Sequence, residues 1–318
     1  ATSTSLTVVV PAGASYQYLS TTNLDYGTTG YSTLPFNVTF SSSGDSSSRP
    51  ASTITSGSGA NTRDIALTDF NRDGKPDIAV ANSDNTVSVF VNQVTSSTAP
   101  LTLSPGVTLG TSSGSASSSI VVGDINGDGL PDILVTNAVT GLVSIYQNTT
   151  LVTGATPTFV LAGPFSATAN PVDMVMADVD GDGLLDIVTV NKSSNAISVL
   201  LNRSTSSTIS FASPQTFATG TSPGALAIGD FNKDGKVDLA VVNSGSNTVS
   251  VFKNASSIGS VSWVVSTLAT GTNPTSIVIA DFDGDAFLDI ATTNAGSNNI
   301  SVFRNNGTTS TLAFASKA

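Results

Sequence analysis

The chain has 318 residues, 39% of them hydrophobic, and it contains no cysteine and no histidine. These absences exclude disulfides, thiolate chemistry, histidine-based acid–base catalysis and the usual zinc sites. All 22 acidic residues are aspartates, and with 11 basic residues they give a net charge of −11, which argues against nucleic acid or an anionic membrane as a partner. Because Ser and Thr supply 92 of the 318 residues and β-branched apolar residues recur, we expect strands and turns.

Residues 1–60 differ in composition from the rest of the chain. Four segments there have the pattern of short strands, at residues 6–10, 16–20, 35–40 and 52–55. The segment also holds four of the five tyrosines: Tyr16, Tyr18, Tyr26 and Tyr31. The start ATSTS, without Met, fits a mature product whose signal peptide has been removed. No apolar run anywhere in the chain approaches the ~20 residues that a membrane-spanning helix needs.

From residue 61 onward the sequence repeats. The nine-residue stretch DFNRDGKPD returns four times with the same polar positions, and successive copies start 55, 54, 52 and 51 residues apart. The five copies occupy residues 69–77, 124–132, 178–186, 230–238 and 281–289. A second motif of the VSVF type follows each copy, as at residues 87–90 and 143–146. Five matches in the same order indicate one structural unit repeated five times.

Each unit has the pattern of four strands. In the second unit an apolar run at 119–123 leads into the aspartate loop, and further strands are expected at 132–137, 143–146 and 158–163. Four-stranded units of about fifty residues are typical of the blades of a β-propeller. A helix-containing α/β repeat is the main alternative, but no 11-residue window shows a helical period. We therefore predict an all-β β-propeller with five repeats over residues 61–318, and residues 1–60 as either an atypical, metal-free sixth blade or an arm used in assembly.

The repeated loop has the form D-x-[D/N]-x-D-G-x-x-D. It places side-chain oxygens at positions 1, 3, 5 and 9, and position 7 can add its backbone carbonyl. Such a dense set of hard oxygen ligands selects Ca²⁺. The predicted ligands are Asp69, Asn71, Asp73, Lys75 and Asp77; Asp124, Asn126, Asp128, Leu130 and Asp132; Asp178, Asp180, Asp182, Leu184 and Asp186; Asp230, Asn232, Asp234, Lys236 and Asp238; and Asp281, Asp283, Asp285, Phe287 and Asp289.

Two other interpretations of these loops compete with calcium binding. An EF-hand requires Glu at position 12 between two helices, whereas here position 12 is Val or Thr and strands flank the loop. Metal-free Asp/Asn/Gly turns remain an alternative, because these residues dominate β-turns. The loops hold 17 of the 22 aspartates, and five bound Ca²⁺ ions, one per repeat, would reduce the net charge from −11 to about −1.

The loops and their spacing resemble the FG-GAP/VCBS-type repeats of integrin α-subunit propellers and of many bacterial extracellular proteins, over residues ~60–316. The resemblance implies Ca²⁺ bound between strands at the blade periphery, and a propeller that serves adhesion or ligand binding. Two features depart from the family pattern. The Phe-Gly and Gly-Ala-Pro signatures are missing, and Ala286 stands where the fifth loop should have Gly.

These features lead to three hypotheses for function. The first is an extracellular, secreted module of bacterial type that binds a protein or carbohydrate ligand without catalysis, through the polar turns at 83–85, 138–141, 192–195, 244–247 and 295–298. Plain solvated turns would have the same sequence. The second is a structural subunit that self-associates into a fibre or surface layer through its N-terminal segment. The third, a propeller-type lyase or hydrolase, is the least favoured, because the five aspartates outside the loops form no recognisable catalytic constellation.

Overall fold

The computed structural model describes residues 5–10, 37–42, 61–96, 101–111, 117–309 and 311–315. All regular elements in these ranges are β-strands. The described residues contain no helix that is long and apolar enough to span a bilayer. From residue 61 onward the strands form five antiparallel sheets in chain order, one per sequence repeat. The all-β fold predicted from the repeats is therefore confirmed.

Each sheet is a blade, and the blades are numbered along the chain. Blade 1 contains β3 (Thr62–Thr68), β4 (Asp77–Asn82), β5 (Thr86–Asn92) and β6 (Leu103–Gly110). Blade 2 contains β7 (Ser117–Gly123), β8 (Asp132–Asn137), β9 (Leu142–Asn148) and β10 (Phe159–Ser166). Blade 3 contains β11 (Pro171–Ala177), β12 (Asp186–Asn191), β13 (Ala196–Leu200) and β14 (Gln215–Ala218). Blade 4 contains β15 (Pro223–Gly229), β16 (Asp238–Asn243), β17 (Thr248–Asn254) and β18 (Trp263–Ala269). Blade 5 contains β19 (Pro274–Ala280), β20 (Asp289–Asn294) and β21 (Asn299–Phe303).

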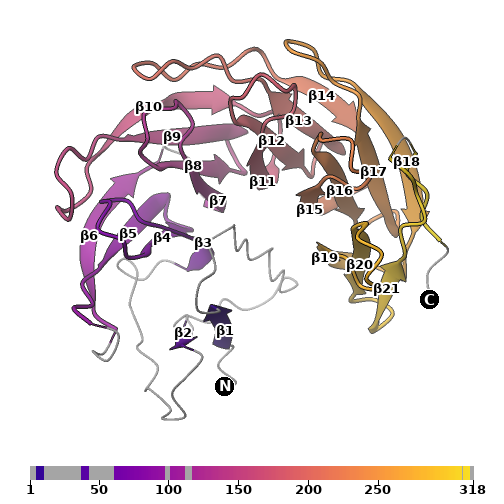
Figure 1. The fold of residues 1–318 in the computed structure, drawn as a ribbon, viewed down its shortest axis with the longest axis horizontal. Helices are drawn as coiled ribbons and strands as arrows, with labels where there is room; N and C mark the ends of the chain where they lie inside the picture. Colours follow the sequence, from indigo (N-terminus) through magenta and orange to yellow (C-terminus); the bar gives the residue numbers. More distant parts are fainter. Residues whose placement is uncertain are drawn as a thin grey trace.

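The blades stand next to one another along an open arc, with the first strand of each on the inside and the last on the outside (Figure 1). Adjacent first strands contact each other from β3 through β19. The second strands of blades 1 to 4 are buried along their whole length, and in blades 2 to 4 a neighbouring blade covers each face. This explains why their sequences, such as DILVTN, are apolar without strict alternation.

The apolar cores lie between blades. One core joins Phe70, Val87 and Val89 of blade 1 to Ile133 and Tyr146 of blade 2. Three further cores join blades 2 and 3, blades 3 and 4, and blades 4 and 5 in the same way. In these four cores each blade buries apolar residues against its neighbour, which is how repeat proteins gain stability from adjacent units. A smaller fifth cluster, with Ile78 and Phe90, lies within blade 1.

The N-terminal segment contributes two described strands. β1 (Ser5–Val10) pairs in parallel with β2 (Asn37–Ser42), which confirms strands near the predicted positions 6–10 and 35–40. The predicted strands at 16–20 and 52–55 lie outside the described residues. Since neighbouring strands within the five blades are antiparallel, the β1–β2 pair is not by itself a sixth blade of the same kind. The number of blades stays a prediction.

Candidate metal centres in the aspartate loops

The five aspartate loops occupy the same place in every blade. Each connects the first strand to the second, and its position 9 is the first residue of the second strand: Asp77, Asp132, Asp186, Asp238 and Asp289. Because consecutive strands are antiparallel, the hairpin between the third and fourth strands lies at the same end of the blade as the loop. The polar turns between the second and third strands lie at the opposite end.

The aspartate at position 1 organises the loop backbone. In blade 3, Asp178 accepts hydrogen bonds from the backbone N–H groups of Gly181, Asp182 and Gly183 at 2.7, 3.1 and 2.9 Å. The chain can turn around this carboxylate because positions 4 and 6 have positive φ, +80° at Gly181 and +90° at Gly183. In the fifth loop Ala286 takes the same conformation, with φ of +70°, as expected from its place in the motif.

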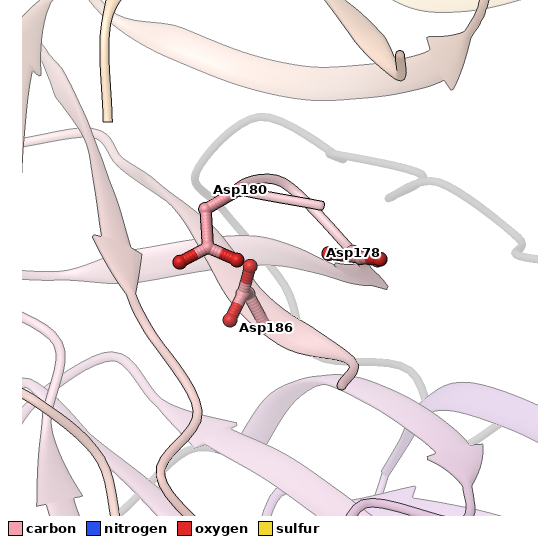
Figure 2. A group of neighbouring side chains, drawn as sticks. All are labelled: Asp178, Asp180 and Asp186. Atoms are coloured by element: carbon pink, nitrogen blue, oxygen red, sulfur yellow. The ribbon is translucent and has the colours of Figure 1, made fainter. Parts of the chain in front are cut away.

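The third loop brings three carboxylates together. Ligand oxygens of Asp178, Asp180 and Asp186, at positions 1, 3 and 9, lie within 4.8 Å of one another. Figure 2 shows Asp180 reaching toward Asp186, with Asp178 beside them. Two oxygens that bind one Ca²⁺ at 2.3–2.6 Å can be at most about 5 Å apart. The spacing therefore fits a single Ca²⁺, and without a cation the three charges repel one another.

The fifth and fourth loops fit the same ion in two further ways. In the fifth loop, oxygens of Asp281, Asp283 and Asp285 lie within 4.8 Å of one another. In the fourth loop, Asn232 at position 3 is fully buried and its Oδ1 has no hydrogen-bond partner. A buried acceptor without a donor is costly, and a cation would satisfy it. The donor sets are therefore compatible with Ca²⁺.

The aspartates at position 9 are the most buried carboxylates among the ligand candidates. Burial raises the pKa of Asp132 to about 7, and those of Asp77, Asp186 and Asp238 to about 6. Hydrogen bonds from two backbone N–H groups lower the pKa of each carboxyl but do not outweigh burial. A cation close to these groups would favour their ionised form.

At position 7 the backbone carbonyl is the predicted ligand, whereas the contact that this structure shows is made by the backbone N–H. Their backbone N–H groups donate to the carboxylate at position 5, at 2.9–3.0 Å in all five loops. Ligation by their carbonyls (Lys75, Leu130, Leu184, Lys236 and Phe287) stays a prediction. Basic side chains also reach two loops: Lys75 pairs with Asp73 at 3.1 Å, and Arg304 pairs with Asp283 and Asp285.

An asparagine that sequence reasoning missed joins each of the first four loops to the next blade. Asn202 of blade 3 is fully buried, and its Nδ2 donates to the carbonyl of Ile125 in the loop of blade 2, at 2.7 Å. The same bond to position 2 of the preceding loop is made by Asn148, Asn254 and Asn305. The signal was present in the sequence, since an Asn follows the last aspartate of every loop at a nearly constant spacing.

The following blade also covers position 3 of each of the first four loops. In blade 4 the hairpin residue Gly259 donates its N–H to Asp180 Oδ2 of blade 3 at 2.7 Å. In blade 2, the N–H of Gly154 donates to the backbone carbonyl of Asn71. In blades 3 and 5, the hairpin carbonyls accept from the preceding loop, Ser206 from Asn126 Nδ2 and Thr309 from Asn232 Nδ2. The first four candidate metal centres therefore lie where two blades meet, and the second blade covers each of them.

The polar turns predicted to bind a ligand recur once per blade. The last residue of each has positive φ: Asn85, Gly141, Asn195, Asn247 and Asn298. A shallow depression of about 510 Å³ lies at the turn of blade 2, where Gly141 and Thr140 face Thr168 and Asn170. These turns provide small polar groups at the end of the blades opposite the aspartate loops.

Comparisons with known proteins agree with this geometry. The FG-GAP-like repeat family matches residues 69–135, 178–241 and 230–292. A protein from Lactobacillus plantarum has a similar structure, with a TM-score of 0.57 and 16% identity over 84% of this chain and 74% of that one. Sqt1 from Chaetomium thermophilum is similar with a TM-score of 0.55 and 14% identity, over 84% of this chain and 61% of that one. A provisionally assigned 6-phosphogluconolactonase from Bacteroides fragilis has a TM-score of 0.55 and 17% identity, over 78% of this chain and 67% of that one. No curated protein matches the sequence. At these identities the structural likeness concerns the fold alone.

Proposed function

Since the chain belongs to the FG-GAP-like repeat family, we propose that it is an extracellular, calcium-stabilised β-propeller that binds a protein or glycan ligand without catalysing a reaction. The carboxylate cluster of Asp178, Asp180 and Asp186 carries the calcium part of the proposal. Ca²⁺ would neutralise the crowded carboxylates and connect the loop to the blade that covers it. The ion is thus assigned a structural role at the contacts between blades.

Calcium binding can be tested by titration. Isothermal calorimetry and native mass spectrometry should detect about five sites, with Kd on the order of 10⁻⁴–10⁻³ M for an extracellular module. The Asp178→Asn/Asp186→Asn double variant should lose one ion and retain the others. Binding of the same number of ions by this variant would contradict the assignment of the third loop.

The ligand part of the proposal rests on the polar turns. They repeat around the arc at the end opposite the metal centres, which leaves them free to contact a partner while the ions hold the blades together. A glycan array and a screen against extracellular matrix proteins test this part. Variants with bulky residues at Asn195 and Asn247 should lose binding to any ligand found, without losing calcium.

A fibre or surface-layer subunit is the second candidate. Its support is that blade 5 has three strands among the described residues, so the outer edge of β21 has no strand beside it there. Such an edge can accept a strand from another chain. Electron microscopy of the native material distinguishes filaments or lattices from single particles.

A further inference from the structure

The last blade has a bare apolar face. Ile300 on β21 is 61% exposed and Phe282, at position 2 of the fifth loop, is 51% exposed. The counterparts of Ile300 in blades 1 to 4 are fully buried: Val87, Val143, Ile197 and Val249. The counterparts of Phe282 are at most 2% exposed: Phe70, Ile125, Val179 and Phe231. In each of those blades, the next blade supplies the covering side chains.

The polar contacts of this face are also incomplete. In blades 1 to 4 the carbonyl at loop position 2 accepts an asparagine amide from the next blade, at 2.7–2.9 Å. Among the described residues, no asparagine amide donates to the carbonyl of Phe282, and no hairpin covers the fifth loop at Asp283. The face therefore has the groups that receive a following unit in the first four blades, both apolar and polar.

Residues 1–60 have the length and the position of such a unit. The segment is about as long as one repeat, the stretch of chain from Asp69 to Asp124, and it leads directly into β3 at the other end of the arc. In the view of Figure 1, β1 and β2 lie in the opening between blade 1 and blade 5. On the opposite side of this opening, Ile78 and Phe90 of blade 1 are buried and pack with Ile65 and Val80 of the same blade. Among the described residues, the exposed apolar face at this opening therefore belongs to blade 5.

Val278 on β19 belongs to the same face and is 57% exposed. We propose that residues 1–60 of the same chain dock on the face formed by Val278, Phe282 and Ile300, close the arc, and cover the fifth aspartate loop as each following blade covers the loop before it. Docking places a covering group over Asp283. The fifth loop is then covered by a following unit, as the other four loops are. Calcium at this loop and docking of the segment then strengthen each other, since coupling between two binding events is reciprocal. The calcium coupling, but not the docking, rests on the proposed function.

The absence of cysteine makes the docking directly testable. In the full chain with Ca²⁺, the Ile300→Cys variant should react with a maleimide roughly tenfold more slowly than the Leu151→Cys control, which corresponds to a face that is covered in about nine molecules of ten. Leu151 is a suitable control because it is an exposed residue of a hairpin in blade 2. Adding Val8→Asp and Val10→Asp, which place charges on β1, should bring the two labelling rates together.

A photo-crosslinker on the Ile300→Cys variant identifies the occupant. The proposal expects adducts to peptides from residues 1–60 at the mass of one chain. Adducts at the mass of two chains would assign the face to a second copy and overturn the proposal. Equal labelling of the Ile300→Cys and Leu151→Cys variants would also overturn it, because the face would then be open.

The coupling to calcium has a separate readout. Removing Ca²⁺ with EDTA should speed the labelling of the Ile300→Cys variant while the Leu151→Cys control keeps its rate. Protection that persists in EDTA would overturn the coupling and leave the docking supported. If calorimetry finds no calcium binding at all, the proposed function fails, and the crosslinked peptides still decide the docking.

Discussion

Ala286 carries a side chain at a loop position where the other four repeats have glycine. Its φ of +70° costs an L-residue on the order of 1 kcal/mol, although its N–H still donates to Asp281 at 2.8 Å as the glycines do in their loops. We expect Ala286→Gly to tighten calcium binding at one site by a few-fold and to stabilise the protein by about 0.5 kcal/mol, since glycine's greater freedom in the unfolded chain offsets part of the gain. Calorimetric titration and urea unfolding measure the two effects.

The matched control for this residue is Gly235 in the fourth loop, which has φ of +85°. Gly235→Ala should weaken one site and lower the free energy of unfolding. If Ala286→Gly leaves calcium affinity unchanged or weakens it, the alanine is not what limits the fifth loop, and its exposure or the nearby Arg304 takes that role.

Asp173 lies outside the loops and connects inner strands. It is buried, accepts N–H bonds from Met174 and Leu226 at 2.9 Å, and lies close to Ser119. Burial raises its pKa to about 7, with a smaller upward effect from Asp64. Between pH ~4 and ~7 the folded protein therefore keeps a proton that the unfolded chain has lost, and the free energy of unfolding falls as the pH rises through this window.

The direction of this pH dependence can be checked with the Asp173→Asn variant. The substitution removes the titrating group, so the variant should gain stability relative to the native chain as the pH rises from 4 to 7, by up to about 4 kcal/mol. Urea unfolding at several pH values measures the difference, and the titration of the loop aspartates is common to both proteins. Asp84→Asn, which also removes one carboxylate but at an exposed turn, is the control. If the difference in the free energy of unfolding between the variant and the native chain does not change with pH, Asp173 is not protonated in the folded protein.

At the scale of elements, the buried asparagines connect neighbouring blades. Asn202 donates to Ile125 and Leu185, and accepts from Ser204 at 2.8 Å. Asn92 makes the same contacts within its own blade, to Pro76 and Val94, but has no preceding loop among the described residues. We expect Asn202→Ala to lower the free energy of unfolding by about 2–4 kcal/mol and Asn92→Ala by about 1–2 kcal/mol, because the former leaves one more buried carbonyl unpaired. If the two variants lose the same free energy of unfolding, the hydrogen bond from Asn202 to the preceding blade contributes nothing to stability.

The elements themselves could be predicted because their signals are local. The strand pattern, the loop spacing and the positive φ at Ala286 all depend on residues that are near one another in the chain. The asparagine contacts were missed because Asn202 and Ile125 are 77 residues apart in the chain. The structure shows that Asn148, Asn202 and Asn254 are buried and connect two blades.

At the scale of the whole molecule, the sequence predicts the units better than their closure. Each unit contains its own strand and loop signals, but the contact between first and last units depends on residues 1–60, which have no aspartate loop to align with the repeats. The β1–β2 pair is parallel, unlike the antiparallel neighbours within the blades. Pattern reasoning could therefore identify strands in this segment without fixing how they pair.

Calcium should control the stability of the whole molecule, because every candidate centre lies in a blade and the first four are completed by the next one. With Kd of 10⁻⁴–10⁻³ M, 10 mM Ca²⁺ stabilises each occupied site by about 1–3 kcal/mol. Five sites together should raise Tm by at least on the order of 10 °C relative to the protein in EDTA. Trp263 is a suitable probe, since its ring packs against Phe217 and Phe252 between blades 3 and 4.

The experiment follows Trp263 fluorescence during heating in EDTA, in 10 mM Ca²⁺, and in 10 mM Mg²⁺. Mg²⁺ is the control for general charge screening, because it requires a tighter octahedral site and loses its water reluctantly. The Asp178→Asn/Asp186→Asn variant should lose about a fifth of the calcium effect if the sites contribute equally. A Tm that is the same in EDTA and Ca²⁺ would show that the loops are metal-free turns.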